Sequence, residues 1–150
     1  MLRLNHTVNP KGIIIMTKYN TNLAAEFYVL SMLHRLGFEA TLTLGNKKSV
    51  DIVVALRTGK AVTIDVKGLA GKTGWPMDNF GRGSKSHFIV FICFRGRIGE
   101  VTALPEVYVV PSPRVARMIY HAPAGRKVMQ LSMLRRNSHK FENGWYLLRR

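Results

Sequence analysis

The chain has 150 residues, of which 47% are hydrophobic and 9% aromatic; this composition excludes a disordered protein and fits one domain with a real core. Lys and Arg number 23 and Asp and Glu number 8, and the resulting net charge of +15 makes a polyanion such as nucleic acid the expected partner. Cys93 is the single cysteine, which excludes an intramolecular disulfide framework and favours a reducing, cytoplasmic location. No apolar stretch approaches the roughly 20 residues that span a bilayer, so we expect no membrane association.

The N-terminal segment is predicted to be an arm outside the core. Residues 1–15 show no clear hydrophobic periodicity, and Met16 is an alternative start of the chain. We therefore divide the chain into an arm over residues 1–19 and a single domain over residues 20–150, which ends in a basic helical extension. No internal repeat marks a second domain.

A helix is predicted from about Thr21 to Leu36. Thr21 and Asn22 can cap its start, and Gly37 suits the left-handed conformation that ends many helices. Four apolar side chains share one arc in helical projection: Leu23, Phe27, Leu30 and Leu33. Glu26 falls inside the same arc. We therefore expect its carboxylate to face the core or a site within it.

Three short runs rich in β-branched residues follow and predict an antiparallel meander: residues 39–44, 50–56 and 61–67. A three-residue loop that ends in Gly59 joins the last two runs and sets Leu56 opposite Lys60. The same register sets Asp51 opposite Asp65. Since side chains alternate along a strand, the two aspartates share one face of this hairpin.

The rest of the chain alternates loops with short elements. Residues 68–86 contain five glycines and predict an irregular, mobile loop. Apolar strands are predicted at 87–94 and 106–110, followed by a helix over 112–120 with Ser112 as its cap. The expected fold is α/β, with a central mixed sheet of about five strands flanked by helices.

Charged side chains gather at one end of the predicted hairpin. Two carboxylates as close as Asp51 and Asp65 need a shared proton, a cation or water to offset their repulsion. Mg²⁺ or Mn²⁺ would satisfy them, because hard cations bind one or two carboxylates together with waters and phosphate oxygens. Lys67 shares this face and could contact a scissile phosphate or orient an attacking water. Glu26 could support a second metal ion or bind a metal-bound water.

The order of these residues resembles the PD-(D/E)xK nuclease superfamily, whose fold is that of restriction endonucleases. The segments AAEFYVLSMLHRLGF, VDIVV and IDVKG are similar to small archaeal Holliday junction resolvases and their uncharacterised prokaryotic relatives. The resemblance covers about residues 20–110. Val50 stands where the family usually has proline, and Asp65 where it often has glutamate.

The resemblance implies a function and a set of roles. Glu26, Asp51 and Asp65 look like the metal-binding acids, and Lys67 looks like the catalytic lysine. The implied enzyme is an Mg²⁺-dependent endonuclease that acts on DNA, with structure-specific cleavage of junctions as one form. A homodimer is also implied, because paired strand cuts need two sites.

Two interpretations compete with a nuclease. A nuclease-like fold could bind nucleic acid without cleaving it, with the same salt dependence but no metal-dependent cleavage. Alternatively, Asp51 and Lys67 could form an ion pair at strand ends in a basic structural or protein-interaction domain. RNA is left open as a substrate in place of DNA.

The glycine-rich segment 68–86 also carries groups suited to nucleic acid. Cations can hold phosphates and an aromatic ring can stack on an unpaired base, so four residues are predicted to contact DNA: Lys72, Trp75, Arg82 and Lys85. Packing of Trp75 as a hydrophobic anchor is the alternative. The sequence GLAGKT is no P-loop, because Val66 stands where the first glycine would be required. Residues 111–150 extend the basic surface, with nine Lys or Arg against one Glu.

Overall fold

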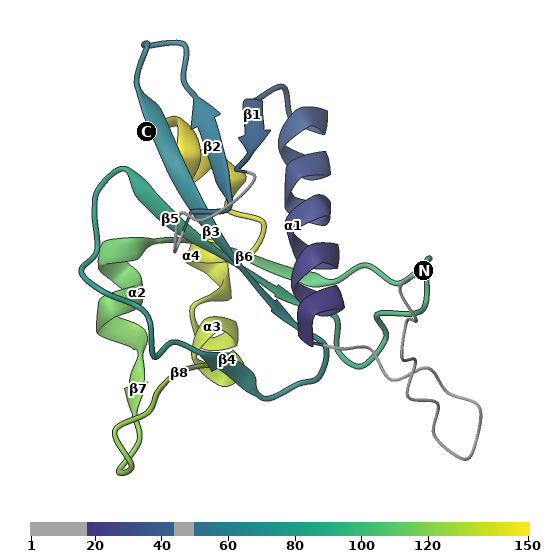
Figure 1. The fold of residues 1–150 in the computed structure, drawn as a ribbon, viewed down its shortest axis with the longest axis vertical. Helices are drawn as coiled ribbons and strands as arrows, with labels where there is room; N and C mark the ends of the chain where they lie inside the picture. The colour runs from purple at the N-terminus through teal and green to yellow at the C-terminus, as the bar shows by residue number, and fades with distance from the viewer. Residues whose placement is uncertain (1–17, 44–49) are drawn as a thin grey trace, which may run out of the picture.

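A five-stranded mixed sheet forms the centre of the computed structural model, which describes residues 18–43 and 50–150 (Figure 1). In spatial order its strands are β1 (Glu39–Leu42), β2 (Ile52–Ala55), β3 (Ala61–Leu69), β5 (His87–Cys93) and β6 (Glu106–Pro111). Strands β3 and β5 are parallel, and the other neighbouring pairs are antiparallel. The predicted α/β fold with a mixed sheet is confirmed. Apart from its last two residues, the predicted arm over 1–19 lies outside the described residues.

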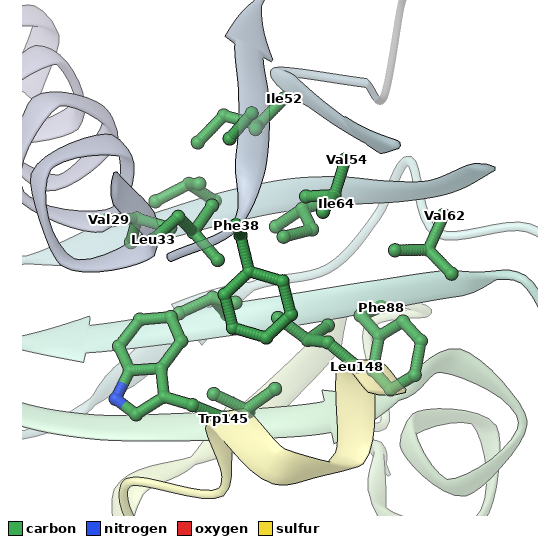
Figure 2. Close-up of a cluster of buried hydrophobic side chains, with 14 of the residues drawn as sticks. Val29, Leu33, Phe38, Ile52, Val54, Val62, Ile64, Phe88, Trp145 and Leu148 are labelled. Carbon is green, nitrogen blue, oxygen red and sulfur yellow. The ribbon is translucent and has the colours of Figure 1, made fainter. Parts of the chain in front are cut away.

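One face of the sheet is covered by helix α1 (Lys18–Arg35) and the 3₁₀ helix η1 (Trp145–Arg149). Figure 2 shows Val29 and Leu33 of α1 meeting Leu148 of η1 and side chains of the central strands in one apolar cluster. This cluster contains alternate residues of β2 and β3, whose side chains share one face of the hairpin: Ile52, Val54, Val62, Ile64 and Val66. It forms the larger of the two cores.

The other face is covered by short helices and by a second, three-stranded sheet. The helices are α2 (Ser112–Met118), α3 (Leu131–Arg136) and α4 (Ser138–Phe141). The small sheet has the order β4 (Gly74–Pro76), β8 (Lys127–Gln130) and β7 (Tyr120–His121). Among the described residues, no helix combines the length and apolarity needed to cross a bilayer.

Helix α1 ends as predicted, but it is rotated relative to the predicted apolar arc. Gly37 has φ +77°, and the Phe38 N–H donates to the Leu33 carbonyl at 3.0 Å, which closes the helix. The buried stripe follows Ala25 and residues four and eight positions later, whereas Phe27 is 56% exposed, so its predicted burial was wrong. The reason lies in β3, where a side chain at Gly68 would meet the Thr21 carbonyl oxygen at 2.8 Å. Because the helix approaches this glycine so closely, the helix face that carries small side chains such as Ala25 must lie against the sheet.

The β2–β3 hairpin has the predicted register. The Leu56 N–H donates to the Lys60 carbonyl at 2.8 Å, and Gly59 has φ +79°. Ala55 lies opposite Ala61, and the last paired residues of the ladder are Ile52 and Ile64. The next position on each strand is an aspartate. The hairpin therefore places Asp51 and Asp65 at the same end of the sheet.

The segment predicted as an irregular loop, 68–86, contains regular structure at its start. Strand β3 continues to Leu69, and Gly74–Pro76 forms β4, in which Trp75 lies opposite Met129 of β8. The partner strand lies some fifty positions further along the chain. Local composition could not reveal this pairing, because the glycines that suggest a loop also allow close strand contact.

Ser112 does not cap its helix in the predicted way. Its hydroxyl donates to the Ser84 carbonyl at 3.0 Å and accepts from the Ser84 N–H at 2.8 Å. A Cβ at Gly83 would lie 2.6 Å from Pro113. The helix start thus holds the segment that leads into β5, instead of capping itself. The helix also ends at Met118, two residues before the predicted end.

Candidate active site

The third strand places Asp65 and Lys67 on the face opposite α1. Ile64 and Val66, the residues between and before them, pack into the core beneath α1, so alternation directs the two charged side chains to the other side. Asp65 is 6% exposed. The Lys67 ammonium lies 3.0 Å from Asp65 Oδ2. The buried carboxylate is therefore ion-paired with a lysine that is still partly open to solvent.

Asp51 lies beside this pair, at the point where the β2–β3 ladder ends. Its Oδ2 accepts a hydrogen bond from the Val66 N–H at 2.7 Å. The carboxylate thus satisfies a backbone N–H that would donate to a carbonyl of the neighbouring strand if the ladder continued. Burial raises the pKa of Asp51 to about 6; the charge and a hydrogen bond of Asp65 act in the same direction, and the Val66 N–H and Lys67 act against them. A protonated Asp51 in this position relieves the repulsion between the two carboxyl groups.

Glu26 approaches the same group from α1 and is half-buried. Burial raises its pKa, the negative charge of Asp51 raises it further, and Lys67 lowers it. Glu26 therefore lies near enough to feel the charges of Asp51 and Lys67, whereas the direct contacts at the site are the Asp65–Lys67 ion pair and the Asp51–Val66 hydrogen bond. The close packing of α1 on Gly68 sets the helix near enough for this.

Two polar residues near the site were missed by the sequence analysis. Thr63 Oγ1 and His87 Nδ1 form a hydrogen bond of 2.7 Å across the parallel β3–β5 pair. Burial lowers the pKa of His87, and Lys67 lowers it as well, while Asp51 and Thr63 raise it. Alternation along the strand puts Thr63 on the same face as Asp65, although it was not named as a site residue. His87 could not be placed in this way, because local sequence does not determine the register of parallel strands that are joined by a long connection.

A polar cleft of about 260 Å³ opens beside the Asp65–Lys67 pair. Its walls come from Asn22 of α1, from the segment 75–80 and from Arg126. Asp78 fixes that segment, because its carboxylate accepts from the Lys127 N–H at 2.8 Å. The ion pair is therefore reachable by a polar substrate from one side.

The predicted nucleic-acid contacts in segment 68–86 separate into two groups. Lys72, Arg82 and Lys85 are exposed, as a phosphate contact requires. Trp75 is 1% exposed and packs edge-on against Phe91, with ring centroids 5.0 Å apart. Its ring lies in the second, smaller core, as the packing alternative predicted, and in this position it is not open to stack on a base.

The predicted three-acid metal site is only partly assembled. Across residues 18–43 and 50–150, no group of three or more His, Cys, Asp or Glu side chains is placed to hold a metal ion. Asp51 and Asp65 remain as a pair of neighbouring oxygen donors, of which Asp65 lines the polar cleft. Such a pair fits Mg²⁺ or Mn²⁺, which commonly bind one or two carboxylates and complete their shells with water and phosphate oxygens.

Comparison with known proteins identifies the fold. No protein-family model matches the chain, and no curated protein matches it in sequence. Its structure is similar to that of the bacterial homing endonuclease I-Ssp6803I, with a TM-score of 0.52 and 16% sequence identity over 88% of this chain and 92% of that one. The chain has a nuclease-like fold. At this identity the likeness concerns the fold alone.

The raised pKa of Asp51 predicts a specific pH dependence of stability. A carboxyl whose pKa rises from 3.8 to about 6 on folding stabilises the protein below about pH 4 and loses that contribution as pH rises through 6. Asp51→Asn should remove this dependence and raise the free energy of unfolding at pH 8 by about 1 kcal/mol, less than the pKa difference alone would give because the side chain is partly solvated. Urea unfolding of both proteins from pH 4 to pH 8 measures the effect. Parallel curves at all pH values would contradict it.

Proposed function

We propose that this chain is a metal-dependent endonuclease of the PD-(D/E)xK type that hydrolyses phosphodiester bonds in DNA. The observation that carries the proposal is the convergence of Asp51, Asp65 and Lys67 beside a polar cleft in a nuclease-like fold. The description of its structural neighbour as a homing endonuclease supports DNA as the substrate class. A net charge of +15 supports a polyanion independently.

Asp51 and Asp65 would hold the metal ion. Mg²⁺ or Mn²⁺ bound there would polarise a phosphate oxygen and lower the pKa of a water molecule. The raised pKa of Asp51 fits this role, because a carboxylate whose charge is opposed by burial and by neighbouring Asp65 gains most from a cation. Glu26 would accept a hydrogen bond from water at the site, since it feels the charges of both Asp51 and Lys67.

Lys67 would act on the scissile phosphate. Its ammonium is held 3.0 Å from Asp65 and is still partly exposed, so it can meet a phosphate oxygen without leaving its partner. Water adds to phosphorus, the bond to one bridging oxygen breaks, and the proton lost by water balances the charge of the leaving oxygen. A positive group placed where negative charge develops lowers the barrier to this step.

A nucleic-acid-binding module without catalysis is the second candidate. The Lys67–Asp65 ion pair favours it, because that pair neutralises the buried carboxylate with no need for a cation. Both functions predict binding to DNA that weakens with salt. Only the nuclease predicts strand cleavage that depends on a divalent metal.

Cleavage of a panel of labelled DNAs tests the proposal. Duplex, single-stranded, flap and four-way junction DNAs would be incubated with the native chain and Mg²⁺, Mn²⁺ or EDTA. We expect cleavage with either metal and none with EDTA; preference for the junction would support resolvase-like specificity, and paired cuts would support a dimer. Binding to the same DNAs without any cleavage, with either metal, would contradict the nuclease proposal and favour the binding module.

A further inference from the structure

A second cleft is lined by residues of α2, α4 and η1 and includes neither Asp65 nor Lys67. It has a volume of about 670 Å³. Five cationic residues line it: Lys85, Arg114, Arg117, Lys140 and Arg150. No Asp or Glu is among its lining residues. We call this the basic cleft.

The charges of the basic cleft are not neutralised within the described part of the chain. The ion pairs formed by residues 18–43 and 50–150 use other cations, and none of the five lies within 4.0 Å of a carboxylate there. Arg150 lies over the ring of Tyr146, 5.2 Å from its centroid. Five unpaired cations in one concave surface repel each other and concentrate positive potential, so the cleft favours an anionic ligand.

Direct contacts connect the basic cleft to the candidate active site. Residues 83–87 join them. On one side, the Ser86 carbonyl accepts at 2.9 Å from the N–H of Thr63, which lies two residues before Asp65 on β3. On the other side, Ser84 is hydrogen-bonded to Ser112 at the start of α2. Lys85 stands between these anchors and lines the cleft. A chain of phosphates could therefore pass from the candidate active site along residues 83–87 to α2.

We propose that the basic cleft binds the sugar–phosphate backbone of DNA that flanks the phosphodiester held at Asp65 and Lys67. The inference rests on the proposed function for the identity of the polyanion. It adds a second contact, in which Arg114 and Arg117 are one turn apart on α2 and Lys85 lies on the path from the active site. An acidic protein segment is a different ligand for the same charges, and the experiment separates the two.

Matched double variants test the proposal. Arg114→Ala/Arg117→Ala removes two exposed cations from the cleft. Arg57→Ala/Lys60→Ala removes two exposed cations from the β2–β3 turn that form no ion pair within the described part of the chain. Dissociation constants for a labelled duplex of about 30 base pairs would be measured by fluorescence anisotropy, in EDTA, over a range of salt. Since EDTA prevents turnover, the result does not depend on whether the chain cleaves DNA.

The two double variants, called the cleft double and the turn double, should differ clearly in DNA affinity. At about 0.1 M salt we expect the cleft double to raise the dissociation constant about 10-fold or more and to reduce the slope of log affinity against log salt by about 2. The turn double should change the constant less than about 3-fold and leave the slope unchanged. Equal effects of both doubles, or none from the cleft double, would overturn the proposal while leaving the nuclease proposal standing. Binding to labelled poly-glutamate would be measured in the same way. If the cleft double variant lost poly-glutamate binding while its DNA binding stayed intact, the proposal would be overturned in favour of an acidic protein partner.

Discussion

Asp65→Asn is expected to reduce metal-dependent DNA cleavage by about 1000-fold or more, while DNA affinity is kept. The substitution conserves shape but removes the negative charge that would bind the metal ion, and about 4 kcal/mol of lost stabilisation in the transition state corresponds to that factor. Affinity should stay equal or rise slightly, because one negative charge facing the phosphates is lost. Initial cleavage rates at saturating DNA, with dissociation constants measured in EDTA, give the two quantities separately.

Asp78→Asn is the matched control for this experiment. Asp78 lines the same cleft as Asp65 but is exposed, and its ion pair with Arg126 at 3.2 Å is a surface contact of small energetic value. Asparagine keeps the side-chain oxygen that accepts from the Lys127 N–H, so the wall of the cleft stays anchored. Its substitution should change the cleavage rate only a few-fold. If Asp65→Asn cleaves at the rate of this control, Asp65 is a structural partner of Lys67 and not a metal ligand. Equal thermal unfolding of the variants shows that any loss of rate is not a loss of fold.

The features that local sequence predicted well are those set by short-range geometry. The loop that ends in Gly59 fixed the register of the hairpin, and this register placed Asp51 and Asp65 at the same end of the sheet. The left-handed Gly37 likewise fixed the end of α1. In each case a single glycine conformation and the alternation of a strand decide the outcome, and no distant partner is needed.

The features that were missed depend on contacts between distant segments. Phe27 was assigned to the core because the apolar arc alone cannot show that Gly68 admits only the small side of α1. His87 escaped notice because it reaches Thr63 through a parallel pairing of β3 with β5. The polar cleft beside Lys67 was equally invisible, since its wall is built by a strand that pairs some fifty positions away.

Trp75→Ala is expected to lower the free energy of unfolding by about 3–5 kcal/mol, the range for truncation of a fully buried large aromatic side chain. The ring is 1% exposed and packs against Phe91 and the second core, and β4 holds it opposite Met129. Removal therefore leaves a cavity at the junction of the two sheets. Urea unfolding of the native and variant proteins, analysed with a common slope, measures the loss.

Trp75→Phe distinguishes packing from recognition of a base, and Tyr146→Ala is the stability control for truncation of an exposed aromatic ring. Trp75 Nε1 is buried without a hydrogen-bond partner among the described residues, so Trp75→Phe loses part of the ring but no hydrogen bond there and should cost less than about 2 kcal/mol. Tyr146 is 52% exposed, and its truncation should cost well under 1 kcal/mol. If the ring serves only the core, Trp75→Phe binds DNA as tightly as the native chain wherever both are folded. A large loss of DNA affinity in Trp75→Phe with unchanged stability would show that the loop opens to present the indole to DNA, against the burial seen here.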